Sequence, residues 1–318
     1  MLTKNEAYNK RLHKGLFLPK AVEAIIRPLL FTTALTAVFI IILIAFFIFQ
    51  KGWPVINSFG LWKMLSGTVW QPTKGLYGIL PMITGTFYIT FIALLIGIPF
   101  GLATAIYLAE IAPARTAGLI RPAIELLAAI PSVIYGLFGM VVINAFMRYL
   151  QRGLLSGILP PDYQLGYSVL SGGIVLAIMI MPTIINIAED ALKAVPRTYK
   201  EAAFALGSTH IQTIFRVLIP AAKSGIVSAI MLAMGRSIGE TMALIMVIGN
   251  VTAMPGHGLL SVFAPSTSLT ATIALEMGYA GPEHRAALFA VGIVLFCIIA
   301  LLNSFVIVFT GRGGQQQS

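Results

Sequence analysis

Long apolar runs alternate with short polar segments along most of this chain. Residues 28–49 carry no charged side chain and are rich in Ile, Leu and Phe. A bilayer core about 30 Å thick needs about 20 apolar residues in a helix. The pattern therefore predicts about six membrane-spanning helices, at about residues 28–49, 82–109, 122–147, 166–188, 223–250 and 286–310.

The composition agrees with a membrane protein and excludes an ordinary soluble domain. Of the 318 residues, 58% are hydrophobic and 10% are charged, with a mean hydropathy of +0.92, whereas soluble domains are about a quarter charged. We expect an all-α integral membrane protein with one membrane domain over 28–310, a basic N-terminal segment over 1–27 and a polar tail over 311–318. The first apolar run is too long for a cleaved signal and no small-x-small site follows it, so it reads as an anchor.

The distribution of Lys and Arg predicts the orientation. The two termini and the connections around residues 111–121 and 189–223 hold 14 basic residues, and the other three connections hold 6. Basic residues are enriched in cytoplasmic loops. We therefore expect both termini, and the long connection over 190–222, on the cytoplasmic side of the inner membrane. The net charge of +10 then needs no nucleic-acid partner.

Metal and thiol chemistry find no support in the sequence. Cys297 is the single cysteine, and the four histidines fall in four separate segments without a ligand-like spacing. We expect no metal, no cofactor bound to this chain and no catalytic site.

Two consecutive helix-start signals occur in the connection over 190–222. Thr198 with Glu201, and Thr209 with Gln212, both fit a capping box. Gly207 lies between them, where a left-handed residue would end the first helix. Ala202 and its small neighbours would let another protein approach closely. These local signals favour a docking element and a plain linker about equally.

A motif in this connection resembles the EAA loop of ABC importer permeases. The family pattern is EAA, three residues, G, nine residues and I-x-L-P, and the spacing matches throughout. Two conservative replacements, Val217 and Ile219, are the departures. The matching residues are Glu201, Ala202, Ala203, Gly207, Val217, Leu218, Ile219 and Pro220.

Two further segments are similar to the PstC family of phosphate-importer permeases. They are residues 124–132 with Tyr135-Gly136, and residues 236–243 with 248–250. The similarity runs from about residue 77 to the end, and the sister PstA family carries a related R-x-x-G-E-T stretch. The resemblance implies the type I ABC importer permease fold, with Glu201, Ala202, Ala203, Gly207 and Pro220 coupling to an ATPase.

The same resemblance implies partners. They are a PstA-like permease subunit, two PstB-like ATPase subunits and a PstS-like extracytoplasmic phosphate-binding protein. This chain contains no G-x-x-x-x-G-K-[ST] segment to hold nucleotide. ATP would therefore be bound by the partner ATPase.

Arg236 and Glu240 are charges inside a predicted span. On insertion scales an Arg at a helix centre costs about 2.5 to 3.5 kcal/mol, so both should face protein or water. Four residues apart, they are expected on one helix face. They either neutralise each other, or Arg236 gives a passing phosphate a bidentate site while Glu240 holds the Arg or accepts a proton. Ser228 and Thr241 are further candidates for the pathway, although close helix packing also explains small residues here.

Other polar residues in the spans favour structural interpretations. Arg121 and Glu125 repeat the four-residue spacing at the start of the third span, where a structural pair suffices. Pro131 predicts a kink in that helix.

The sequence thus predicts a non-catalytic permease subunit of an ATP-driven phosphate importer, forming half of the translocation pathway. A permease for another oxyanion or solute remains an alternative. So does an autonomous anion channel or ion-coupled carrier, which would transport without an ATPase. A membrane enzyme is disfavoured because no nucleophile-base set is evident.

Overall fold

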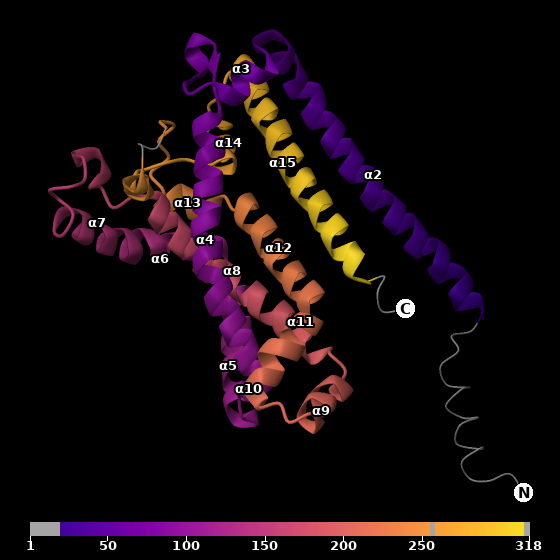
Figure 1. The fold of residues 1–318 in the computed structure, drawn as a ribbon. Coiled ribbons are helices and arrows are strands. Elements are labelled where there is room, and N and C mark those ends of the chain that lie inside the picture. The colour runs from indigo at the N-terminus through magenta and orange to yellow at the C-terminus, as the bar shows by residue number, and fades with distance from the viewer. Residues whose placement is uncertain (1–19, 255–257, 315–318) are drawn as a thin grey trace, which may run out of the picture. The chain divides into compact units, whose positions relative to one another are not determined.

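The computed structural model describes residues 20–254 and 258–314, and this part of the chain is largely helical (Figure 1). The chain divides into two units, residues 1–51 and 52–318. Helix α2 (Lys20–Phe59) forms the described part of the first unit and continues into the second. The predicted span 28–49 lies on α2. Most of the predicted basic segment and the last residues of the predicted tail lie outside the described residues.

The second unit contains the remaining membrane-length helices. They are α4 (Leu80–Ile106) with the π-helical turn η2 (Tyr107–Ile111), the continuous run of α6 (Ser132–Phe138), η3 (Gly139–Ile143) and α7 (Asn144–Arg152), then α8 (Val169–Lys193) and α15 (Pro282–Gly314). A further pair, His210–Ala221 and Lys223–Gly239, is long and apolar enough but bent by 70°. The described residues thus hold five candidate spans, or six if the bent pair is one span.

Shorter elements connect the spans. Strands β1 (Trp70–Gln71) and β2 (Leu76–Tyr77) form a small antiparallel hairpin in which Trp70 faces Tyr77. The bent pair consists of α10 (His210–Thr213), the π-helical η5 (Ile214–Leu218), α11 (Ile219–Ala221) and α12 (Lys223–Gly239). The other short elements are α3 (Leu61–Ser66), η1 (Pro72–Lys74), α5 (Ala114–Ala129), η4 (Pro161–Tyr163), α9 (Arg197–Ala205), α13 (Met242–Val247), η6 (Leu259–Phe263) and α14 (Leu269–Glu276).

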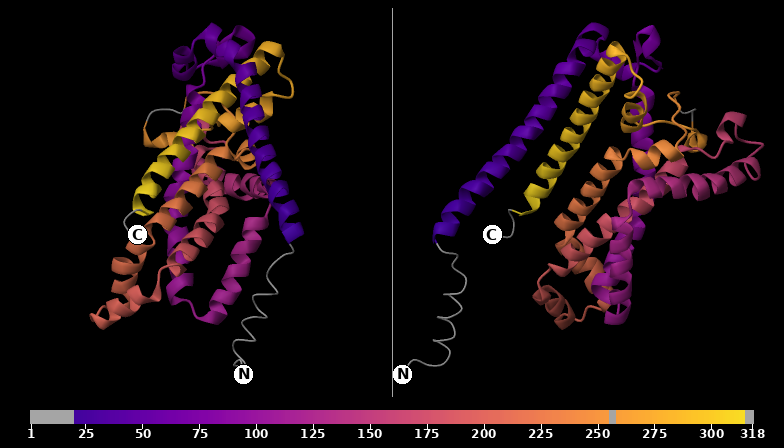
Figure 2. Two further views of the ribbon diagram at one scale, coloured as in Figure 1. Left: turned by 90° about the vertical axis from the view of Figure 1, so that its right-hand side faces the viewer. Right: turned by 180° about the vertical axis from the view of Figure 1, so that it is seen from behind.

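The core of the second unit is the close packing of α4 against α8, with α12 alongside both (Figure 2). Glycines make the approach possible. Gly97 faces Ile180, and Gly101 faces Ile184 one turn further along. Both isoleucines are fully buried. Small residues at such contacts let helix backbones approach closely. The contact then gains dispersion energy, which drives helix association in a membrane because lipid tails are as apolar as the helix surface.

The third predicted span, 122–147, is wrong because these residues do not form one continuous helix. Helix α5 ends at Ala129, and Ile130 and Pro131 have extended backbones with ψ of 127° and 141°. A proline disfavours the helical conformation of the residue before it. The predicted kink is therefore a complete break, and the membrane-length run starts at Ser132 and ends at Arg152.

The predicted span 223–250 is also interrupted. Helix α12 ends at Gly239, and Glu240 is extended with φ −70° and ψ 132°. After α13 the chain turns through Gly249 and Asn250, whose φ values are 89° and 53°. It then folds back so that Gly249 pairs with Ser266 in a single parallel bridge.

A hydroxyl-rich segment follows that bridge. Residues 266–272 are all buried, and their side chains bond mostly to one another or to nearby backbone. Thr86 on α4 accepts from the backbone nitrogen of Leu269 at 3.0 Å. Buried backbone groups need such internal partners.

Trp70 fixes the hairpin to α14 and α15. Its indole nitrogen donates to Oε2 of Glu276 at 2.9 Å, and Nε2 of His284 lies 2.6 Å from the same oxygen. The Trp70 and His284 rings meet edge to face with centroids 6.0 Å apart. Side chains from β1 and α15 therefore share one carboxylate oxygen of α14.

Candidate functional site

Helix α9 carries most of the predicted coupling motif and lies, with α10, at the end of the second unit opposite α3 (Figure 1). It begins at Arg197 with Pro196 at the N-cap and no side-chain cap. The predicted capping box at Thr198 and Glu201 is therefore wrong. Pro196 has a φ of −56°, which suits the entry to a helix, and it starts the helix two residues early. Glu201 and Ala202 are exposed, while Ala203 is buried.

Gly207 ends α9 as predicted. Its φ of 81° is left-handed. Its nitrogen donates to the carbonyl of Phe204 at 2.9 Å, and the nitrogen of Ser208 donates to the carbonyl of Ala203 at 3.0 Å. These two bonds form a Schellman motif, in which a non-glycine residue would be strained.

The second predicted capping box is confirmed. Thr209 Oγ1 accepts from the nitrogen of Gln212 at 3.3 Å, and Gln212 Oε1 accepts from the nitrogen of Thr209 at 3.0 Å. The cap starts α10 directly after the turn at Gly207. Pro220 follows on α11, just before the 70° bend at Ala222.

Exposed apolar side chains surround this turn. Leu206 is 87% exposed, Ile211 67% and Phe215 60%. These three residues, together with the exposed Glu201 and Ala202, are here named the coupling surface. Exposed apolar patches mark contacts with another protein or with a membrane.

Helix α12 presents two of the predicted residues, Ser228 and Arg236. They lie in a row with Ser224 and Leu232 at four-residue spacing, and all four are exposed. We name this face the α12 stripe. Ala229 and Ala233, on another face of α12, are fully buried.

Arg236 lies at the C-terminal end of the stripe, next to open space. Its Nη1 lies 3.4 Å from Thr183 Oγ1 on α8. A Cβ added to the neighbouring Gly235 or Gly239 would meet nothing within 4 Å. Among the described residues, the contact with Thr183 is the hydrogen bond that the guanidinium makes, so most of its five donors stay available to another group.

Glu240 does not share a helix face with Arg236, and that prediction is wrong. Glu240 Oε1 accepts from the nitrogen of Ala243 at 3.2 Å, in the first turn of α13. Its carbonyl accepts from Thr270 Oγ1 at 2.8 Å. Among the residues described, no Arg236–Glu240 ion pair occurs. Thr241 lies beside them, with Oγ1 3.3 Å from the carbonyl of Gly239.

Arg121 pairs with Glu189 rather than with the predicted Glu125. Arg121 Nε and Nη2 each lie 2.7 Å from Glu189 Oε1, and Lys193 Nζ lies 2.5 Å from it. The Glu189 side chain is only 5% exposed. A buried carboxylate needs such partners, which explains why it recruits a cation 68 positions away.

Sequence reasoning also missed Glu110. This carboxylate lies on η2, is only 9% exposed and forms an ion pair with Lys200 on α9. A signal was available, since Glu110 is the sole acidic residue at the end of a long apolar run. Its partner on α9 follows only from the fold.

A family model decides the class of protein to which these features belong. The sequence matches the binding-protein-dependent transport system inner membrane component over residues 97–312. The chain belongs to this permease family. The match includes both α9 and Arg236.

Curated relatives define the permease more closely. The phosphate transport system permease protein PstC of Pasteurella multocida is 37% identical over 285 residues, which cover 86% of this chain and 88% of the relative. The PstC protein of Haemophilus influenzae is 38% identical over 283 residues, covering 85% and 88%. A probable ABC transporter permease protein of Bacillus subtilis, YqgH, is 39% identical over 245 residues, covering 76% and 75%. The resemblance to PstC is thereby confirmed.

Solved structures confirm the permease fold. A bacterial ABC transporter involved in the import of alginate aligns with a TM-score of 0.58 at 15% identity, over 92% of this chain and 99% of that one. The inward-facing MetNI methionine ABC transporter aligns with a TM-score of 0.53 at 19% identity, over 77% and 99%. The permease is thus a multi-pass inner-membrane component of an ABC transporter, whose ATPase is a separate subunit.

Proposed function

We propose that this permease forms half of the translocation pathway of an ATP-driven phosphate importer. The observation that carries the proposal is the exposed Arg236 on the α12 stripe, combined with relatives that are named phosphate transport system permeases. An uncompensated Arg in hydrocarbon costs about 2.5 to 3.5 kcal/mol on insertion scales. The stripe therefore faces water or a partner subunit rather than lipid.

Arg236 is the residue that contacts phosphate in this proposal. A guanidinium fork donates two parallel hydrogen bonds to an oxyanion. Ser228 lies two turns away on the same stripe and Thr241 lies just beyond the end of α12, so their hydroxyls can extend the polar path. Glu240 holds its carboxylate at the start of α13, where it accepts from the nitrogen of Ala243.

The second half of the path comes from a PstA-like permease subunit. The α12 stripe is lined on one side by Gly235 and Gly239, so a neighbouring subunit can approach it without a side chain in the way. A PstS-like binding protein delivers phosphate from the extracytoplasmic side.

The coupling surface binds one of two PstB-like ATPase subunits. Both termini and α9 lie on the cytoplasmic side in this proposal, in accord with the excess of Lys and Arg there. Exposed Leu206 and Ile211 supply apolar contact area, and exposed Glu201 supplies a charge at the edge. ATP is bound by the ATPase subunits, and this chain needs no cofactor.

Reconstitution tests the proposal. The permease is assembled with its partner subunits in vesicles that contain ATP, with binding protein and radiolabelled phosphate outside. We expect phosphate uptake that requires ATP and that excess sulfate does not reduce. Arg236→Gln should abolish uptake while assembly persists, and Arg115→Gln, which removes an exposed charge elsewhere, should leave it unchanged.

Each alternative has its own result in the same assay. Displacement by sulfate would indicate a permease for another oxyanion. Transport without ATP or ATPase would indicate an autonomous channel or carrier. Uptake by Arg236→Gln at the rate of the unchanged protein would remove Arg236 from the pathway.

A further inference from the structure

One ion pair joins helix α9, which carries part of the coupling surface, to the end of a membrane span. Lys200 Nζ on α9 donates to Oε2 of Glu110 on η2, the π-helical turn that extends α4. His210 at the start of α10 also approaches this carboxylate, with Nε2 at 3.9 Å from Oε2. The side chains of Lys200 and Glu110 are 32% and 9% exposed. The contact is therefore largely shielded from water.

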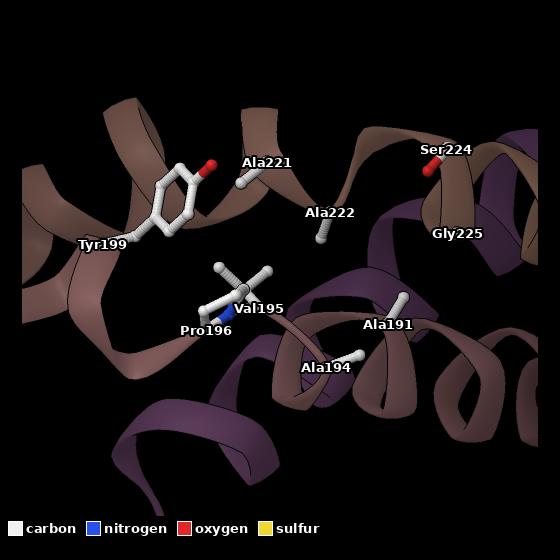
Figure 3. A pocket seen from close by; sticks show the side chains of 9 residues that line it. All are labelled: Ala191, Ala194, Val195, Pro196, Tyr199, Ala221, Ala222, Ser224 and Gly225. Carbon is white, nitrogen blue, oxygen red and sulfur yellow. The ribbon is translucent and has the colours of Figure 1, made fainter. Parts of the chain in front are cut away.

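Two cavities lie beside α9. A partly open cavity of about 630 Å³ lies where α9 meets the ends of η2 and α8, and its lining includes Glu110, Lys193, Lys200 and Phe204. A second cavity of about 270 Å³ lies between the start of α9 and the bend before α12 (Figure 3). Tyr199 and Pro196 line one wall and Ala222 the other (Figure 3). Close packing is thus interrupted on both of these sides of α9.

The charges at this end of the unit form two separate groups. Glu189 holds α8 to α5 through Arg121, and its other partner, Lys193, belongs to α8 itself. Glu110 holds α4 to α9 through Lys200. The first group ties spans to each other, whereas the second ties a span to the helix that carries the coupling surface.

Helix α4 is well placed to pass a displacement onward. It packs along α8 for most of its length and also contacts α12, which carries Arg236. Closely packed helices shift as units rather than deforming locally. A π-helical turn at the end of α4 is the kind of local irregularity that often occurs at functional sites.

We propose that the Glu110–Lys200 pair is the link through which movement of α9 reaches α4. Glu110 is then a positioning residue for energy coupling, since it contacts neither phosphate nor ATP. This inference rests on the proposed function, because it assumes that an ATPase moves α9. Breaking a shielded pair leaves a charge unpaired, so α9 should loosen from α4 while its exposed surface remains intact.

The test uses the complete reconstituted importer and three readouts: ATPase retained on purification, ATP hydrolysis, and phosphate taken up per ATP. We expect Glu110→Gln and Lys200→Gln to retain the ATPase and its hydrolysis. Phosphate per ATP should fall by about tenfold, the size of a typical coupling between contacting residues. The double variant should be no worse than either single one. Asp190→Asn, an exposed acid at the same end of the unit, should match the unchanged protein.

Several results would overturn the inference. They are a normal ratio of phosphate to ATP in Glu110→Gln, losses that add in the double variant, and loss of the ATPase from Lys200→Gln, which would place Lys200 in the docking contact. If the unchanged importer itself lacks ATP-dependent phosphate uptake, the proposed function fails before any variant is compared.

A covalent replacement covers the case in which Glu110→Gln does not assemble. Glu110→Cys and Lys200→Cys are combined with Cys297→Ser, which removes the single native thiol. Uptake should be low with free thiols and return when a short bifunctional reagent joins the pair. Uptake that stays low after cross-linking would contradict a linking role.

Discussion

A Cβ added to Gly101 on α4 would lie 2.8 Å from Cγ2 of Ile184 on α8. The two helices therefore approach more closely here than an alanine would allow. The same face of α4 carries Gly97 one turn earlier, opposite Ile180. Any displacement passed along α4 acts directly on α8 through these contacts.

Gly101→Ala tests this approach. Overpacking of a filled contact costs about 1 to 3 kcal/mol, so we expect a lower unfolding temperature in detergent. Gly118→Ala is the control, because nothing lies within 4 Å of its added methyl group and alanine favours a helix by about 1 kcal/mol. Equal unfolding temperatures for Gly101→Ala and the unchanged protein would contradict the contact.

Gly207→Ala tests the end of α9. The left-handed conformation costs an alanine about 1 to 2 kcal/mol, so the turn should shift and the coupling surface with it. We expect less ATPase to copurify with this variant. Gly207→Asn should retain more ATPase than Gly207→Ala and less than the unchanged protein, since asparagine tolerates the left-handed conformation better than alanine does. Full copurification by Gly207→Ala would show that the turn does not position the coupling surface.

Arg236→Lys separates charge from geometry. Lysine keeps the positive charge but loses the planar fork. A charge-assisted hydrogen bond contributes about 1.5 to 3 kcal/mol, so we expect uptake to fall by about tenfold or more at low phosphate concentration. Arg115→Lys, at an exposed position off the stripe, is the control. Equal uptake by both variants would indicate that charge alone suffices.

Leu206→Asp tests the coupling surface. This side chain is 87% exposed, so the change should cost little folding stability, but it places a charge in an apolar contact. We expect the ATPase to be lost during purification. Leu154→Asp alters a leucine of similar exposure, 77%, in the loop after α7, and should retain it. Retention of the ATPase by both would place the docking contact elsewhere.

Local signals predicted local structure well. The left-handed turn at Gly207 and the cap at Thr209 each depend on residues fewer than six positions apart, and both were correct. The cap expected at Thr198 failed although its signal looked the same. Pro196 lies two residues earlier, and its ring fixes a backbone angle that suits the start of a helix. The capping-box pattern takes no account of a proline before it.

Long-range contacts decided what the sequence could not predict. The break after Gly239 is held by the bond from Thr270 to the carbonyl of Glu240, 30 positions away. Arg121 pairs with Glu189 rather than with Glu125, four positions away, because the buried Glu189 carboxylate needs a cation partner. Hydrophobic runs located the spans, but their interruptions depend on partners that only the fold brings together.

The Trp70 contact offers an intrinsic optical reporter. The chain has three tryptophans, and Trp53 and Trp62 are 57% and 80% exposed, whereas Trp70 is 6% exposed. With the first two replaced by phenylalanine, this chain's tryptophan fluorescence would come from the one indole that donates to Glu276 beside His284, and partner subunits without tryptophan would leave it as the single source in the assembly. Its emission would then follow, without any added dye, whether the hairpin stays attached to α14 and α15 during a transport cycle.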